Sequence, residues 1–163
     1  MLSPAIVVLA AIFLTRGLPA PVTLDGVGGA RPGMTAAAVS QAWNTPLRLD
    51  APIRPGCRTA VVSRGGMRGY ALFERSRFGA VFFTKGARTP SGITIGSSLN
   101  ALQRAYRGRL TSRPDVYQHG GRNYFLTRRS RPHWQIRFDV SVRDRVTRIS
   151  FGNAAVRYTE GCA

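Results

Sequence analysis

The feature that most constrains the fold of this 163-residue chain is a helix start that occurs twice. Residues 31–35 (RPGMT) lead into an alanine-rich stretch, and residues 94–98 (TIGSS) lead into a second stretch with helical spacing of apolar residues. In both places a glycine turn precedes a hydroxyl side chain suited to cap a helix, and Thr35 and Ser98 stand at an offset of 63 residues. Self-similarity at a fixed offset is the signature of repeat architectures. The recurrence therefore predicts two tandem repeats.

Both predicted helices have clear ends. The first is expected to begin after Thr35 and to stop before Pro46, because the residue before a proline disfavours the helical conformation. The second is expected over residues 99–106, with Gly108 as its C-terminal glycine. Trp43 and Tyr106 occupy equivalent helix ends, and large aromatic side chains in such places are expected to anchor a core.

Segments with strand character follow each helix. In the clearest one, Trp134, Ile136 and Phe138 alternate with Gln135 and Arg137, which is typical of a strand with one buried and one solvated face. Strands are expected at residues 59–63, 69–75 and 78–85 in the first half, and at 122–128, 134–140 and 145–151 in the second.

These elements predict an α+β fold of two tandem repeats, each with one short helix packed on a three-stranded, or slightly larger, antiparallel sheet. A unit of about 60 residues has a small core, so the two sheets are expected to join or to pack edge to edge. Residues 1–25 are interpreted as a signal peptide or N-terminal anchor with a lead-in, residues 26–90 as the first repeat, and residues 91–163 as the second repeat with a C-terminal tail.

The pattern resembles the helix-on-antiparallel-sheet repeat of the beta-lactamase inhibitory protein and of the small outer-membrane assembly lipoproteins. The segments that carry the resemblance are residues 31–35 and residues 95–99 (IGSSL), each a glycine turn before a capped helix that ends in an aromatic residue. No inhibitory residue is carried over, because the two cysteines lie one in each half and no lipidation cysteine follows the N-terminal apolar run. The resemblance implies a fold and the binding of proteins through an open sheet face.

The N-terminus predicts export. Residues 5–14 (AIVVLAAIFL) form an uninterrupted apolar run, which has the length of a signal-peptide hydrophobic region and is too short to span a bilayer comfortably. No Lys or Arg precedes the run, and Pro21 follows the candidate cleavage residue Ala20. Cleavage nearby and retention as an N-terminal membrane anchor both remain open. The predicted location is secreted, periplasmic or in the cell envelope.

Cys57 and Cys162 are the only cysteines in the chain. In an exported protein they can form one intramolecular disulfide, which would connect the region after the first helix to the penultimate residue. The alternative is two free thiols in a reducing cytoplasm. The signal-like N-terminus favours the disulfide between Cys57 and Cys162.

The chain is strongly basic, with 24 Lys and Arg residues against 7 Asp and Glu residues and a formal net charge of +17. A basic protein attracts polyanions and anionic membrane surfaces. Lys85 is the only lysine, and such an excess of arginine over lysine is also what a GC-rich genome produces. A functional and a genomic origin of the charge both stay open.

The titratable residues offer little for catalysis. A small basic exported nuclease would need a general base, a general acid and a phosphate clamp, and the candidates are Glu74, His133 and Arg137. His119 lies in a glycine-containing turn and His133 follows a proline at a strand start, both ordinary places for a solvated histidine. We therefore expect a protein that is not an enzyme, with no metal site and no cofactor.

The expected function is that of an exported binding protein that recognises a protein or an anionic cell-envelope component through the solvated face of its sheet. Gln135, Arg137 and Arg148 are the residues predicted to line this face. The alternatives are a small secreted nuclease and a polyanion-binding protein. Nucleic acid is the less favoured partner, because Tyr124 and Trp134 beside the arginine cluster fall on the buried phase of their strands.

The predicted disulfide can be tested by mass. The full chain without reductant should be about 2 Da lighter than after reduction, and reduction should lower the free energy of unfolding by about 4 to 5 kcal/mol, since the bond closes a loop of about a hundred residues. Cys57→Ser should remove both effects. Equal masses with and without reductant would contradict the pairing.

Overall fold

The computed structural model describes residues 20–52 and 54–158. The elements are, in chain order, β1 (Val22–Thr23), β2 (Gly26–Val27), α1 (Ala36–Trp43), β3 (Cys57–Arg64), β4 (Met67–Glu74), β5 (Arg77–Lys85), α2 (Leu99–Ala105), β6 (Leu110–Pro114), β7 (Arg122–Arg128), β8 (Arg131–Val140), β9 (Val146–Gly152) and the 3-10 helix η1 (Ala154–Arg157).

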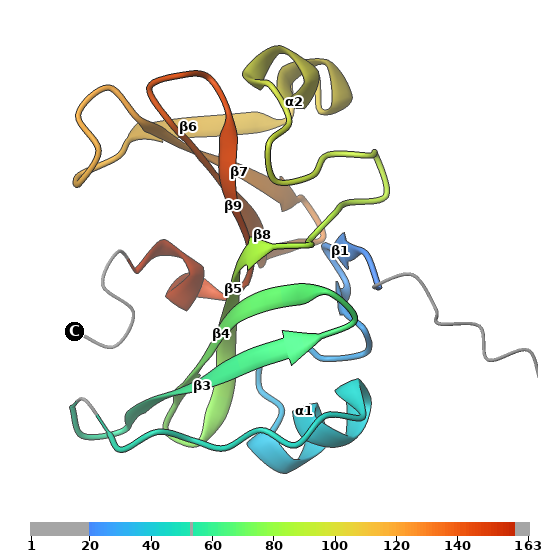
Figure 1. The fold of residues 1–163 in the computed structure, drawn as a ribbon, viewed down its shortest axis with the longest axis vertical. Coiled ribbons are helices and arrows are strands. Elements are labelled where there is room, and N and C mark those ends of the chain that lie inside the picture. Colours follow the sequence, from blue (N-terminus) through green and yellow to red (C-terminus); the bar gives the residue numbers. More distant parts are fainter. Residues whose placement is uncertain (1–19, 53, 159–163) are drawn as a thin grey trace, which may run out of the picture.

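Seven of the strands form one antiparallel sheet in the order β3-β4-β5-β9-β8-β7-β6, and β1 and β2 form a separate two-stranded ribbon. The sheet is continuous because β5 pairs with β9 in its middle, with a register that runs from Ala80 opposite Gly152 to Phe83 opposite Ile149. Both helices lie on one side of this sheet, and η1 lies on the other side (Figure 1).

The prediction of two tandem helix-and-sheet repeats is wrong. The strands of the two halves join into one sheet, which was one of the two expected arrangements, but the halves are not repeats of one unit, since three strands follow α1 and four follow α2. The additional strand is β6, which was not predicted because four of its five residues are exposed and its sequence, LTSRP, lacks alternation and contains a proline. The chain is an α+β protein with two α-helices on a single seven-stranded sheet.

The recurring helix starts come from shared local chemistry. Thr35 and Ser98 are N-caps, and each side-chain oxygen accepts a hydrogen bond from the backbone N–H three residues on, at 3.2 Å in both cases. The glycines two residues before them, Gly33 and Gly96, have φ values of 92° and 94°, a left-handed conformation that favours glycine. The two segments therefore look alike because each needs a glycine turn and a hydroxyl side chain that accepts from a free backbone N–H at the helix start. Both predicted helix starts are confirmed.

The main core lies between the sheet and the two helices. The Trp43 ring is 2% exposed, its Nε1 donates to the Val27 carbonyl at 2.7 Å, and it meets Phe78 edge to face at 5.9 Å. At the end of α2, the Tyr106 ring lies 5.7 Å from the Phe138 ring, measured between ring centroids. The predicted roles of Trp43 and Tyr106 as core anchors are confirmed.

A smaller cluster covers part of the opposite face of the sheet. Its buried members come from β3, β4, β5 and η1, and they are Cys57, Leu72, Ala80, Phe82, Ala155 and Val156. The C-terminal segment thus acts as the cover for one half of this second face.

The six predicted strands all form, with ends displaced by a few residues. Among the described residues, no helix is both long and apolar enough to cross a membrane. The apolar run at residues 5–14, on which the prediction of export depends, lies outside the described residues.

Glycine at position 152 is required where β5 and β9 meet. A methyl group at Gly152 would lie 2.3 Å from the Gly79 carbonyl oxygen and 2.6 Å from the Ala80 Cα. Because the obstacle is backbone, Gly152→Ala should lower the free energy of unfolding by about 3 kcal/mol, measured by urea denaturation. Thr111→Ala on the exposed edge strand should change it by less than about 0.5 kcal/mol. Equal stability of Gly152→Ala and the unmodified protein would contradict this requirement and would show that the β5 backbone can move away from a methyl group at position 152.

Candidate binding face

The predicted binding residues do share one face of the sheet. Arg137 on β8 lies opposite Ser150 on β9, and Asp139 lies opposite Arg148. Gln135 belongs to the same face because side chains on one face recur every second residue along a strand. The expectation of a solvated face is wrong at two positions, however, since Gln135 and Arg137 are only 6% and 3% exposed.

Arg137 is used inside the protein. Its Nε donates to the Asp139 carboxylate at 2.5 Å, and its Nη1 donates to the backbone carbonyls of Val156 at 3.3 Å and Tyr158 at 3.2 Å. A guanidinium suits this task because its donors form a fixed fork. The side chain fixes the C-terminal segment to the sheet.

Gln135 holds the same segment. Its Oε1 accepts a hydrogen bond from Arg157 Nε at 2.8 Å, and the Arg157 guanidinium carbon lies 5.3 Å from the centre of the Phe125 ring. Two of the three predicted ligand-binding side chains therefore bind residues 156–158 of their own chain. Alternation along β8 identified their face correctly but gave no sign of what covers it.

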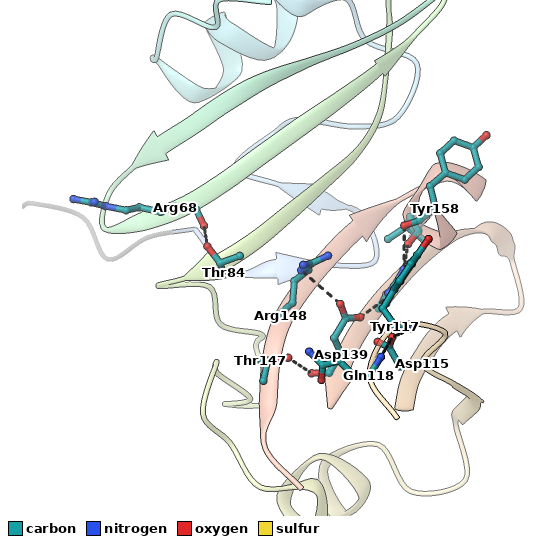
Figure 2. A network of polar contacts seen from close by, with 11 residues as sticks. Arg68, Thr84, Asp115, Tyr117, Gln118, Asp139, Thr147, Arg148 and Tyr158 are labelled. Atoms are coloured by element: carbon teal, nitrogen blue, oxygen red, sulfur yellow. Dashed lines mark hydrogen bonds and ion pairs between the residues drawn. The ribbon is translucent and has the colours of Figure 1, made fainter. Parts of the chain in front are cut away.

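A polar network extends from Arg137 toward the end of the sheet. With the Asn123 amide oriented so that its nitrogen faces two carboxylates, that nitrogen donates to Asp139 at 3.0 Å and to Asp115 at 3.1 Å, while its oxygen accepts from Arg137 Nη2 at 3.3 Å. The Asp115 carboxylate in turn accepts from the backbone N–H groups of Tyr117 and Gln118 (Figure 2). The network connects the buried arginine to the β6–β7 loop.

Asp139 is the central acid of this network. Burial raises its pKa above the ordinary value of 3.8, and the positive charges of Arg137 and Arg148 act in the opposite direction. A buried carboxylate with two cationic neighbours and a hydrogen-bonding amide is a satisfied structural group.

Arg148 differs from the other two predicted residues, because its side chain is 31% exposed and its Nε lies 3.5 Å from Asp139 Oδ2. The uncovered half of the face also holds Thr84 and Arg68. The Thr84 hydroxyl donates to the Arg68 carbonyl at 3.4 Å, and the Arg68 side chain points away from Arg148 (Figure 2). Arg68 and Thr84 are both exposed. This half of the face is open, with cationic and hydroxyl side chains.

An aromatic and an aliphatic side chain border these polar groups. Tyr70 stacks on Phe82 with 4.8 Å between ring centroids, and Val61, opposite Tyr70 on the edge strand β3, is 73% exposed. Burial raises the pKa of the Tyr70 phenol above its ordinary 10.0, so the hydroxyl remains a neutral hydrogen-bond donor at physiological pH. We call Val61, Arg68, Tyr70, Thr84 and Arg148 the open patch.

Of the open patch, the sequence predicted only Arg148. Val61 is followed by Val62, and two adjacent β-branched residues do not show which of them faces solvent. Tyr70 follows Gly69, where a Cβ would lie 1.9 Å from the Phe82 carbonyl oxygen. That close approach of β4 to β5 is a long-range contact with no local signal.

Two of the three residues considered for a nuclease make hydrogen bonds within the protein, and the third is exposed at a strand start. Glu74 accepts a hydrogen bond from the Tyr158 hydroxyl at 3.0 Å, which raises the pKa of Tyr158, while Arg137 is buried in its network. His133 is exposed near the start of β8. Among the described residues, no group of three or more His, Cys, Asp or Glu side chains could hold a metal ion.

No protein-family model matches the chain, and no curated protein matches its sequence. The fold resembles part of a secreted protein. The match is a crystal structure of a cysteine-rich secretory protein from Staphylococcus aureus subsp. aureus Mu50, with a TM-score of 0.51 and 13% identity over 83% of this chain and 49% of that one.

A second solved structure, an extracellular protein containing an SCP domain from Bacillus anthracis str. Ames, has a TM-score of 0.49 and 7% identity over 75% of this chain and 44% of that one. The chain thus spans about half the length of the proteins it matches. At these identities the likeness shows the fold alone.

The resemblance to the beta-lactamase inhibitory protein and the outer-membrane assembly lipoproteins is wrong, since the fold similarity found is to the solved structure of a cysteine-rich secretory protein. The motif that carried it, a glycine turn before a capped helix, is short and follows from helix-capping chemistry. The predicted disulfide stays a prediction, because Cys57 is buried at the start of β3 and Cys162 lies outside the described residues.

Arg137→Met should lower the free energy of unfolding by about 3 to 5 kcal/mol, because it leaves the buried Asp139 carboxylate without its closest cation. It also removes both hydrogen bonds to the C-terminal segment, so proteolysis near residue 157 should become faster. Arg129→Met in the exposed β7–β8 turn is the control and should change stability by less than about 0.5 kcal/mol. A loss for Arg137→Met as small as that of the control would contradict the anchoring role.

Proposed function

We propose that this protein is an extracellular, non-enzymatic binding domain that recognises an acidic segment of a protein partner through the open patch. The observation that supports the proposal is the division of one sheet face into a half closed by the C-terminal segment and a half left open. Gln135 and Arg137 bind the C-terminal segment on the closed half and are not accessible to a partner. Of the three predicted residues, only Arg148 lies on the open half, and we assign recognition to that half.

The composition of the open patch fits a protein partner. Arginine and tyrosine are enriched at the centres of protein interfaces, and the neutral Tyr70 phenol and the nearby Arg148 guanidinium can each donate a hydrogen bond to a carboxylate. The neighbouring Asp139 carboxylate is largely buried and is paired with both Arg137 and Arg148, so its single negative charge does not cancel the positive charge of these two arginines and Arg68. The exposed charge is therefore positive, which favours an acidic ligand.

An extracellular location is supported by two independent considerations. The structures with a similar fold are described as a cysteine-rich secretory protein and an extracellular protein. The N-terminal apolar run predicts export from the sequence. Both considerations agree with a binding role in the cell envelope or outside the cell.

The proposal can be tested by fluorescence anisotropy with two labelled probes, poly-L-glutamate as an acidic polypeptide and single-stranded RNA as a general polyanion. The double variant Arg68→Glu/Arg148→Glu should bind poly-L-glutamate about tenfold more weakly than the unmodified protein, because it reverses both positive charges of the patch. RNA length is read in the same samples.

The matched control is Arg104→Glu/Arg107→Glu, which changes the net charge equally on the exposed surface at the end of α2. It should reduce binding by less than about threefold. Equal losses for the two double variants would show that net charge alone drives binding and would overturn the proposal. RNA cleavage that His133→Ala abolishes would instead establish a nuclease.

A further inference from the structure

A pocket lies where the end of α2 meets β6, the strand that forms one edge of the sheet (Figure 1). The helix and the strand are joined by a turn in which the Arg109 backbone N–H donates to the Tyr106 carbonyl at 2.9 Å. The pocket has a volume of about 330 Å³, which is the size of a site for a small molecule. Side chains and backbone from α2, the turn, β6 and β7 line it, and the lining residues are Gln103, Tyr106, Gly108, Leu110, Ser112 and Tyr124. We call it the α2–β6 pocket.

Two buried tyrosines of the pocket have hydroxyl groups without a partner. Tyr106 and Tyr124 are only 5% and 8% exposed, and both are held by Phe138, which lies opposite Tyr124 in the sheet and 5.7 Å from the Tyr106 ring. Among the described residues, neither hydroxyl forms a hydrogen bond with the protein. Both hydroxyls still reach open space, because the fully enclosed side-chain polar atom that lacks a partner in this part of the chain is Ser150 Oγ. The rings are therefore fixed in the core while their hydroxyls are free to bind a ligand.

A third hydroxyl of the pocket is oriented by an arginine. Ser112 lies opposite Tyr124 on the same face of the sheet, and its Oγ accepts a hydrogen bond from Arg122 Nη2 at 2.8 Å. Because the Ser112 oxygen is already used as an acceptor, its proton is available to a ligand. The Arg122 side chain is exposed, and a guanidinium has five N–H donors. The edge of the pocket thus presents a hydroxyl donor and, beside it, a cation with donors to spare.

The chemistry of the lining indicates the class of ligand. Phenol hydroxyls and the Gln103 amide both donate and accept hydrogen bonds, as the hydroxyl groups of a sugar do. Of the described residues that line the pocket, none is acidic, so no negative charge opposes an anionic group. A carboxylate is the anion that guanidinium donors match in geometry. Its single charge also suits the one arginine, Arg122, that contacts the lining, whereas a phosphate ester carries up to two charges.

We propose that the α2–β6 pocket binds a sugar acid, which is a six-carbon sugar unit that carries a carboxylate. The carboxylate accepts hydrogen bonds from the Ser112 hydroxyl and the Arg122 guanidinium. The sugar hydroxyls bind the side chains of Gln103, Tyr106 and Tyr124. The open patch lies on the other face of the sheet, because Ser112 and Tyr124 share the face of Phe138, and Arg148 is opposite Asp139, the next residue along β8. The proposal therefore does not depend on the proposed function.

The first test follows the backbone amide signals of Ser112 and Tyr124 by NMR in the isotope-labelled full chain. The probes are the sodium salts of D-glucuronate, D-galacturonate and D-mannuronate, and at least one should shift both signals to saturation. Glucose, galactose and mannose should bind at least about tenfold more weakly, because they lack the charge-assisted hydrogen bonds. Sodium acetate at the same concentration should also bind at least about tenfold more weakly, because it lacks the hydroxyl groups.

The second test removes hydroxyl groups and leaves the fold in place. The double variant Ser112→Ala/Tyr124→Phe keeps the buried ring and should bind the tightest of the three sugar acids at least about tenfold more weakly. The matched control Thr111→Ala/Tyr70→Phe removes the same two kinds of hydroxyl from the other face of the sheet and should change binding by less than about twofold. Urea denaturation of both variants checks that they remain folded.

Four outcomes would overturn the proposal. None of the three sugar acids shifts the signals of Ser112 and Tyr124, or the neutral sugars or acetate bind as tightly as the acids. Alternatively, the double variant binds as tightly as the unmodified protein, or Arg68→Glu/Arg148→Glu on the other face weakens sugar-acid binding as much as the pocket variant does. That last result would show that net charge alone drives binding. Loss of poly-L-glutamate binding alone in Arg68→Glu/Arg148→Glu would support both proposals as separate sites.

Discussion

The pairing of β5 with β9 is the contact on which the rest of the structure depends. It joins strands from the two halves of the chain into one sheet, with Ala80 opposite Gly152 and Phe82 opposite Ser150. The main core against α1 and α2 is continuous only because this joint exists. The second face depends on it equally, because the row from Tyr70 through Phe82 and Ser150 to Arg137 crosses from β4 to β8 at this point.

The charged residues on the second face of the sheet are accommodated in two different ways. On one half, Arg137 and Asp139 are buried as a pair, and the cost of removing them from water is offset by hydrogen bonds to Asn123 and to backbone carbonyls. On the other half, Arg68 and Arg148 stay in contact with solvent. One half holds the fold together and the other keeps its arginines exposed, so positive charge has two different environments on a single surface.

The sequence allowed the local structure to be predicted more fully than the long-range structure. The caps at Thr35 and Ser98 depend on neighbouring atoms, and the alternation along β8 depends on spacing, so both could be read directly from the residues. Partner choice between β5 and β9 has no local signal, and for that reason the residues left open whether the strands of the two halves join or pack edge to edge. The face of Arg137 was correct, but its burial was not, because the cover comes from η1, which follows almost directly after the last strand.

The way in which Arg137 holds the end of the chain has a consequence for sequence divergence. Its guanidinium binds the carbonyl oxygens of Val156 and Tyr158, which every amino acid possesses, and not their side chains. Related chains could therefore exchange the outward-facing residues of this terminal segment freely and still retain the same attachment. An arginine at the position of Arg137, with an acid two residues later, would be the more durable marker of this architecture among distant relatives.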